Sequence, residues 1–299
     1  NSGMRRSASW AERRKSMQEK KKKSRTWVGY LLVCPAFLVM LAVVIIPICN
    51  SVLLSFQGED GGMTWDNYLY FLTDDASIRN ILFTLKVAVF TIVLALFISY
   101  ALALYLRFST SRVSRLVGHL YLLPRFVPSM VAVYAVINIV KDSGLINRIS
   151  LLFEQNIKPG FLFDDKGIIL VNLWFSIPFA TMMLLAGLSG VSDSLVESAR
   201  DAGASSRQIF TKLLLPLTFK DIMITGTFIF MSQIGAFTIP YLVGPNNPKM
   251  LGVALFQQQS SYADYPKAMA LSVIMFLLCS VGAVLYIWTS LKDPEWAEK

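Results

Sequence analysis

Glu197-Ser198-Ala199-Arg200-Asp201-Ala202-Gly203 is followed, after nine further residues, by Leu213-Leu214-Leu215-Pro216. This polar stretch lies inside a segment, 193–221, that separates two long apolar runs. In a chain that crosses a membrane, such a segment lies in water at one face of the bilayer, because hydrocarbon does not solvate its charged side chains. The local signals in this segment, and the apolar runs around it, decide the fold that we expect.

The first half of the segment predicts a short helix that ends at a turn. Ser194 and Glu197 have the capping-box spacing, a hydroxyl followed three residues later by a carboxylate, which marks a helix start. Glu197 and Arg200 lie three residues apart and can pair on one helix face. Gly203 then allows a turn at a position where a Cβ would clash.

The second half predicts another short helix. Ser205 or Ser206 can cap its start, and Pro216 ends it because proline cannot continue a helix. The helix has an apolar face formed by Ile209, Phe210 and Leu214. A helical hairpin with exposed apolar residues suits docking into a groove on a partner protein. The alternative is a membrane-surface helix that contacts only lipid.

Composition places the rest of the chain in a membrane. Hydrophobic residues make up 55% of the 299 residues and the mean hydropathy is +0.54, which is more apolar than an ordinary soluble domain. A hydrocarbon core needs about 20 apolar residues in a helix. Gaps between charged residues predict six such helices, near 28–56, 82–106, 116–140, 168–191, 222–243 and 268–291.

The distribution of Lys and Arg predicts the orientation. These residues concentrate before the first helix, in 107–115, in 193–221 and after the last helix, whereas the loop 57–80 is rich in Asp and Glu. By the positive-inside rule, both termini and the 193–221 segment are cytoplasmic in a plasma (inner) membrane. Anionic lipid accounts for the basic N-terminal segment, so we expect no nucleic-acid partner. The predicted domains are a basic cytoplasmic segment 1–25, a six-helix membrane domain 26–292 and a cytoplasmic tail 293–299.

The 193–221 segment resembles the EAA loop of type I ABC importer permeases. That loop has Glu-Ala-Ala, three residues, Gly, nine residues and Ile-x-Leu-Pro. The chain departs from it mildly, with Ser198 in place of Ala and Leu213 in place of Ile. The resemblance implies that this loop couples the membrane helices to a separate ATPase. The residues that it assigns to coupling are Glu197, Ser198, Ala199, Asp201, Gly203, Ala204, Ile209, Phe210, Leu213, Leu215 and Pro216.

The resemblance also implies a fold and a set of partners. The fold is an all-α, polytopic membrane protein with six transmembrane helices, the type I ABC importer permease fold. The partners are a second, related permease subunit, two copies of an ABC ATPase that bind ATP and Mg, an extracytoplasmic substrate-binding protein and membrane lipid. The chain carries no Gly-x-x-x-x-Gly-Lys-[Ser/Thr] motif, so we expect no ATPase site, no enzyme activity and no cofactor of its own. Its single histidine, His119, makes no metal site.

Leu123-Pro124 with Pro128 is similar to the proline pair that interrupts the third helix in type I importer permeases. Ile234–Gly244 is similar to the fifth-helix region of permeases for polyamines, phosphonates, thiamine and ferric iron. Residues 251–258 and 264–272 also look like that group. The resemblance therefore favours import of a polyamine, phosphonate or similar small charged solute. A sugar or oligosaccharide importer is the alternative, because the long N-terminus and first helix are similar to those of sugar permeases.

Polar side chains inside the predicted helices are candidates for the solute path, because lipid penalises them. They are Arg125, Asn138, Asn172, Ser176, Ser232, Gln233 and Thr238. For the uncharged residues, hydrogen bonding between helices is the competing role. Arg125 is the only charge well inside a predicted helix, and its competing role is to extend toward the cytoplasmic interface.

Two functions of other classes remain. An ion-driven secondary transporter or channel would need acidic residues inside the helices, and the four ranges 82–106, 168–191, 222–243 and 268–291 contain none. A membrane-bound enzyme would need clustered His, Asp, Glu or Cys at membrane depth, and the sequence shows no such cluster. The sequence does not identify the solute, since selectivity in such importers lies largely in the binding protein.

Overall fold

The computed structural model describes residues 33–58 and 60–291, with the side chains of 289–291 excepted. The predicted segment 1–25, the tail 293–299 and the start of the first predicted helix lie outside the described residues. The chain divides into two compact units, one ending at Leu54 and one beginning at Ser55. The described residues of the first unit form an apolar helix that begins at Val33 and ends one residue beyond the unit, at Ser55. It has a π-helical turn at Leu41–Ile45 followed by α2 (Ile46–Ser55).

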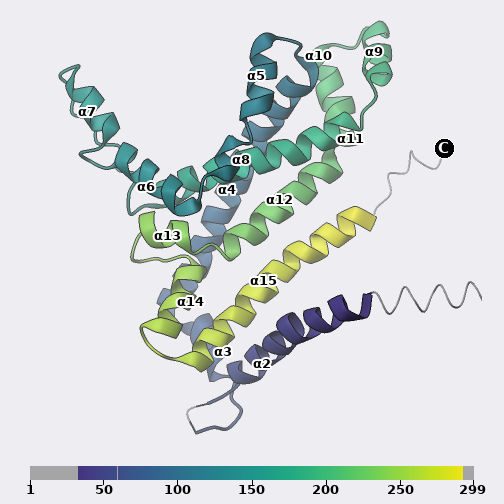
Figure 1. Ribbon diagram of the computed structural model, residues 1–299. Coiled ribbons are helices and arrows are strands. Elements are labelled where there is room, and N and C mark those ends of the chain that lie inside the picture. The colour runs from purple at the N-terminus through teal and green to yellow at the C-terminus, as the bar shows by residue number, and fades with distance from the viewer. Residues whose placement is uncertain (1–32, 59, 292–299) are drawn as a thin grey trace, which may run out of the picture. The chain divides into compact units, whose positions relative to one another are not determined.

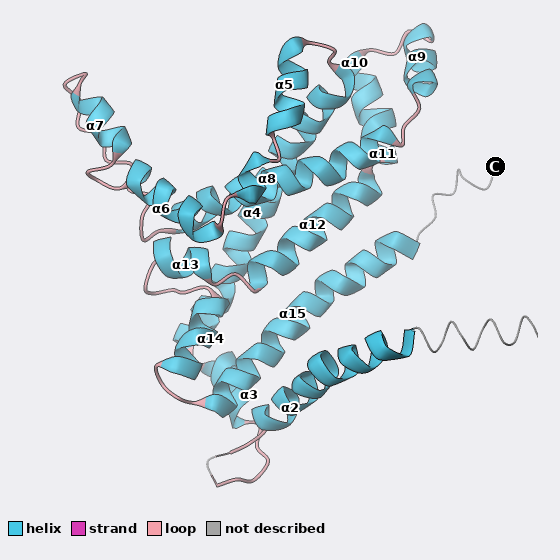
Figure 2. Ribbon diagram, in the orientation of Figure 1, coloured by secondary structure: helices cyan, strands magenta, loops and turns pink. Residues whose placement is uncertain are grey.

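The second unit is helical throughout its named elements (Figure 2). Its first part contains α3 (Asp66–Thr73), α4 (Asp75–Phe108), α5 (Arg112–Leu120), the 3-10 turn η2 (Leu123–Phe126), α6 (Ser129–Val140), α7 (Leu145–Leu151) and α8 (Asp165–Ser189). Its second part contains α9 (Asp193–Asp201), α10 (Ser206–Gln208), the π-helix η3 (Ile209–Leu214), α11 (Leu215–Leu217), α12 (Phe219–Ile234), α13 (Thr238–Val243), α14 (Leu251–Ser260) and α15 (Tyr265–Leu291). The all-α prediction is confirmed.

Five helices of the described chain are long and apolar enough to cross a membrane. They are Val33–Ser55, Asp75–Phe108, Ser129–Leu151, Asp165–Ser189 and Tyr265–Trp288. A sixth span results if the pair Ser206–Leu217 and Phe219–Ile234, which bends by 63°, counts as one. The predicted number of six is therefore reached only with a bent fifth span.

Two of the predicted helices are interrupted: the break that the proline pair predicted in the third helix is confirmed, whereas the prediction of a continuous helix over 222–243 is wrong. The range 116–140 contains a break at residues 121–128, where Pro124 and Pro128 lack the N–H groups that a continuous helix needs. The range 222–243 breaks at Gly235, before α13 begins. The third span runs on to Leu151, beyond residue 140 where the predicted helix ends.

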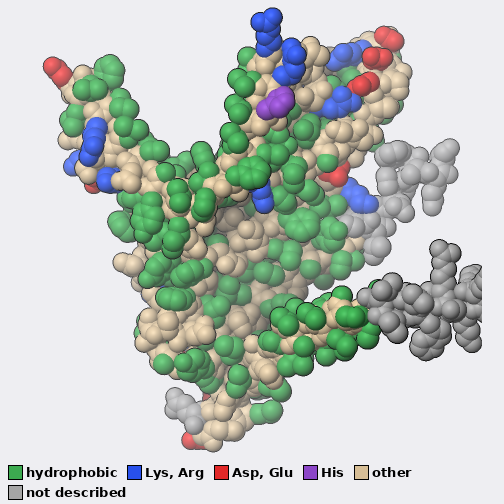
Figure 3. All heavy atoms as spheres, in the orientation of Figure 1, with side chains coloured by type: hydrophobic (Ala, Val, Ile, Leu, Met, Phe, Trp, Pro, Cys, Tyr) green, Lys and Arg blue, Asp and Glu red, His purple; other side chains and the backbone are tan. Residues whose placement is uncertain are grey.

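The long helix α4 forms the centre of this unit, with α8 and α12 packed along it (Figure 1). Asp74 caps its start by accepting a hydrogen bond of 2.8 Å from the Ser77 N–H, which lowers the pKa of the Asp74 carboxyl. Hydrophobic clusters lie along α4 at both of its ends. In Figure 3, charged side chains gather at the end that carries α5 and α9, whereas hydrophobic side chains cover the middle.

Helices α8 and α12 approach each other closely at one glycine. A Cβ placed on Gly187 of α8 would collide with the side chain of Asp221 in the first turn of α12. Only glycine leaves room for that carboxylate at this crossing. This close approach lies at the end of the unit where the 193–221 segment connects the two helices.

Candidate functional site

The predicted helix-turn-helix is present, and Gly203 forms its turn. The Gly203 N–H donates to the carbonyl of Arg200 (2.8 Å), and the Ala204 N–H donates to that of Ala199 (3.0 Å), which together make a Schellman motif at the end of α9. Gly203 has φ of +83°, a conformation that glycine adopts at little cost. No atom lies within 4 Å of the position of its Cβ, so the backbone conformation, and not the predicted clash, requires glycine here.

The cap of the second helix is confirmed and that of the first is not. The Ser205 hydroxyl accepts from the Gln208 N–H (3.3 Å), and the Gln208 side chain accepts from the Ser205 N–H (2.8 Å), which completes a capping box. Helix α9 instead begins at Asp193, so Ser194 lies inside it and is not its N-cap. Glu197 and Arg200 form no ion pair among the described residues.

The apolar face of the second helix points into the subunit, which corrects the prediction that it is exposed for docking. Ile209 and Leu214 are 6% and 5% exposed and pack in a cluster with Tyr100, Leu184 and Leu188 of α4 and α8. Burial of these side chains stabilises the contact between the loop and the spans through the hydrophobic effect.

Tyr100 of α4 joins the loop to the spans by a polar contact as well. Its ring packs edge-on against Phe210, with 5.8 Å between centroids, and its hydroxyl lies 2.7 Å from the Thr218 hydroxyl. Thr218 is fully buried at the bend between α11 and α12. At the other end of the loop, Arg107 donates to Asp193 (2.6 Å). We call residues 190–218 the coupling loop from here on, after the role that the sequence resemblance predicts for them.

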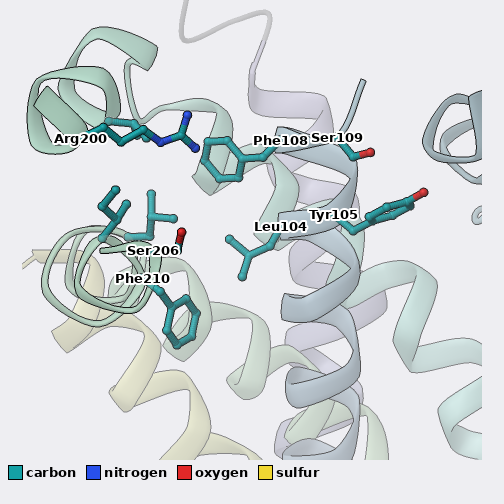
Figure 4. A pocket seen from close by; sticks show the side chains of 10 residues that line it. Leu104, Tyr105, Phe108, Ser109, Arg200, Ser206 and Phe210 are labelled. Atoms are coloured by element: carbon teal, nitrogen blue, oxygen red, sulfur yellow. The ribbon is translucent and has the colours of Figure 1, made fainter. Parts of the chain in front are cut away.

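The outer surface of the coupling loop is polar and open. The exposed predicted residues are Glu197, Ser198, Asp201, Gly203 and Pro216, and the partly buried ones are Ala199, Ala204, Phe210, Leu213 and Leu215. Between the loop and α4 lies a cavity of about 410 Å³ (Figure 4). Arg200 reaches across it from α9 toward Phe108, and Leu104 faces the same space.

A second feature, deeper in the spans, gathers polar side chains between α8 and α12. Asn172 of α8 donates to Gln233 of α12 at 2.6 Å, and both side chains are buried. They line a cavity of about 260 Å³ with Ser176, Ser232 and Thr238. All five are among the predicted solute-path residues, and the structure brings them together.

A neighbouring cavity of about 240 Å³ shares Phe175, Ser176 and Ser232 with the first one. Arg125 of η2 lines it, and its guanidinium lies 5.2 Å from the centre of the Phe179 ring. Among the described residues, Arg125 forms no ion pair. We call these two adjoining cavities the polar cavity.

A known protein family matches the part of the chain that contains the coupling loop and most of the polar cavity. The family described as "Binding-protein-dependent transport system inner membrane component" matches residues 95–292, which include the coupling loop, α8 and α12. The chain belongs to this family.

Two permeases are similar to most of the chain at low sequence identity. This chain is 24% identical over 224 residues to the spermidine/putrescine transport system permease protein PotB of Escherichia coli K12, and the match covers 75% of this chain and 81% of PotB. The chain is 27% identical over 285 residues to the sulfoquinovosyl glycerol transport system permease protein SmoG of Agrobacterium fabrum, covering 87% and 89%.

The fold matches a solved importer. A chain in the crystal structure of a bacterial alginate ABC transporter, in complex with an alginate-bound periplasmic protein, superimposes with a TM-score of 0.77 at 19% identity. The match covers 90% of this permease and 94% of that chain. The type I importer permease fold and the family resemblance are thereby confirmed. This permease is the inner-membrane component of an ABC importer and not its ATPase.

One predicted residue of the permease lies away from the polar cavity, and several cavity residues were not predicted. The Asn138 side chain donates to the carbonyl of Tyr134 on its own helix (2.9 Å) and accepts from Lys141 (2.9 Å). Ser129, Phe175, Phe179, Phe228 and Phe237 line the polar cavity. Ser129 carries the same signal as the predicted residues, a hydroxyl within an apolar run, whereas the phenylalanines are indistinguishable in sequence from lipid-facing ones.

Proposed function

We propose that this permease forms half of the translocation pathway of an ATP-driven importer and that the polar cavity is part of that pathway. A second, related permease subunit supplies the other half, and an extracytoplasmic binding protein delivers the solute. The polar cavity supports this role because it collects hydrogen-bonding side chains from α8 and α12 at membrane depth. Polar groups there are costly unless they bond with each other or with something that passes.

The coupling loop is the contact with the ATPases in this proposal. One observation carries it: the loop has an exposed polar outer surface and an inner surface packed on α4 and α8 through the buried cluster and Tyr100. Force applied to α9 by a partner would therefore reach the spans directly. The loop and both termini are then cytoplasmic, in agreement with the positions of Lys and Arg.

The solute is a small charged or hydroxylated molecule. The named relatives serve different solutes, spermidine and putrescine for PotB and sulfoquinovosyl glycerol for SmoG. Both solute classes that the sequence left open, charged solutes and sugars, are thus represented among the relatives. The side chains of the polar cavity are the better guide to the choice.

The experiment targets Gly203. We expect the full-length chain to purify with an ATPase, and Gly203→Val to abolish uptake while membrane insertion persists, because a β-branched residue at positive φ disrupts the turn. Gly203→Asn is the matched control, since asparagine tolerates this conformation and is expected to retain most of the uptake. Normal uptake by Gly203→Val, or uptake without nucleotide by the chain alone, would contradict the coupling role.

A further inference from the structure

The polar cavity carries a single charge. Arg125 is the only Asp, Glu, Lys, Arg or His among the described residues that line it. Its guanidinium has the Phe179 ring as its recorded contact, and a neutral ring does not balance a positive charge as a carboxylate would. A guanidinium presents five N–H donors, most of which remain available here.

The position of Arg125 is set by the chain around it. The Arg125 N–H donates to the carbonyl of Leu122 (3.0 Å), and the Val127 N–H donates to that of Pro124 (3.3 Å), which closes a short 3-10 turn. This turn packs against α8, so it holds the arginine beside Phe179 and Ser176. The turn therefore sets the backbone of Arg125 beside the cavity, and the exposed Arg125 side chain lines it.

The rest of the cavity offers hydrogen bonds and apolar rings. Ser176 and Ser232 line both cavities, and neither hydroxyl has a side-chain hydrogen-bond partner among the described residues. Asn172 and Gln233 use one bond on each other, which leaves the Asn172 oxygen and the Gln233 amino group for another partner. Phe179 and Phe228 meet edge-on at 6.2 Å and form an apolar wall.

From this set of groups we infer that the solute is a small hydroxylated anion, such as a sugar acid, whose acidic group contacts Arg125 as it passes. This inference rests on the proposed function. A guanidinium binds a carboxylate, sulfonate or phosphonate through paired N–H donors, and the serine and amide groups match hydroxyls. A polyamine does not fit, because the lining offers no carboxylate and Arg125 would repel it.

The test measures binding to the complete importer, full-length chain included, in nanodiscs. The probes are D-glucuronate, D-glucose and spermidine. We expect wild type to bind glucuronate in preference to the other two. Arg125→Gln should weaken glucuronate binding by roughly tenfold to a hundredfold, the range for losing a hydrogen bond to a charged group, and leave glucose unchanged. Arg125→Lys should retain part of the affinity, because it keeps the charge and loses the fork.

Controls separate the other sources of an anion. Arg112→Gln, an exposed arginine of α5 outside the cavity, should bind glucuronate as wild type does. Measurements in phosphatidylcholine and in phosphatidylglycerol nanodiscs should agree. Competition by phosphatidylglycerol would mean that Arg125 binds a lipid headgroup. Loss of the second permease subunit in Arg125→Gln would mean that Arg125 contacts that subunit. Either result overturns the inference.

Equal glucuronate binding by wild type and Arg125→Gln, preference for spermidine, or binding of none of the probes also overturns it. The proposed function is scored separately in the same preparations. Two readouts do not depend on Arg125. They are the co-purification of the ATPase with the full-length chain and the loss of uptake in Gly203→Val. A failed solute assignment therefore leaves the importer role standing, whereas absence of the ATPase would remove both.

Discussion

The coupling loop and the polar cavity arrange the same kinds of side chain in opposite directions. In the loop, Ile209 and Leu214 point into the subunit and the charged residues point outward. In the cavity, Asn172, Gln233 and Ser176 point inward. The outer surfaces of the helices that are long enough to cross a membrane carry apolar residues. The difference follows from the surroundings, water in one case and hydrocarbon in the other, because each solvent excludes the groups that it does not solvate.

The largest effect is expected at the buried amide pair of the polar cavity. Gln233→Leu leaves the Asn172 amide buried and unpaired, so we expect it to lower the unfolding free energy by about 1–3 kcal/mol. The double variant Asn172→Leu/Gln233→Leu should lose less than the sum of the single variants. Denaturant unfolding of the purified chain in detergent measures this. Asn138→Leu is the control, because the Asn138 amide is exposed and donates to a carbonyl of its own helix. Additive losses would show that the two amides do not act as a pair.

A smaller effect is expected where the loop meets the spans. Tyr100→Phe keeps the ring on Phe210 and removes the hydroxyl that bonds Thr218, a change of about 1 kcal/mol. We expect ATP hydrolysis by the assembled importer to persist while uptake per ATP falls. Tyr105→Phe, whose hydroxyl bonds Ser111 at the exposed surface, should change neither. Unchanged uptake per ATP in Tyr100→Phe would mean that the buried hydroxyl plays no part in transmitting movement from the coupling loop to the spans.

The smallest effect is expected at the water-facing edge of the loop. In the Arg107–Asp193 pair the Asp193 side chain is 68% exposed and the Arg107 side chain 21%, and solvent screening of the exposed carboxylate limits such a pair to about 0.2–1 kcal/mol. Arg107→Gln should therefore lower stability slightly, and the loss should shrink as salt is added. Thermal unfolding at two ionic strengths measures it, with Asp193→Asn as the matched variant. A large or salt-independent loss would show that this edge behaves like the buried interior.

Sequence reasoning reached most of the coupling loop because its signals are local. The Ser205 cap and the Gly203 turn each depend on a few neighbouring residues. The predicted end at Pro216 is wrong, because the helix continues through Pro216 to Leu217 and the chain bends at Thr218. Sequence reasoning also failed on the direction of Ile209 and Leu214, because an apolar face packs equally well on a partner or on the same chain. It also placed the first cap at Ser194, since the position where α8 ends and the chain turns depends on packing.

For the polar cavity, the sequence predicted individual polar residues but not which of them lie together. Asn172 and Gln233 lie 61 residues apart, and nothing in either neighbourhood indicates that they pair. Asn138 looked equivalent to them because a polar residue in an apolar run carries the same penalty whether its own helix or another satisfies it. The phenylalanine walls carried no signal at all.

The crossing of α8 and α12 at Gly187 depends on the absence of a side chain there. The Asp221 side chain occupies the space that any larger residue at 187 would need, so the two helices approach this closely only with glycine at that position. At the far end of α12, Gln233 bonds Asn172 of α8. The coupling loop is thus continuous with a helix that meets α8 near both of its ends, and a displacement of the loop would be carried along α12 to the passage between the helices.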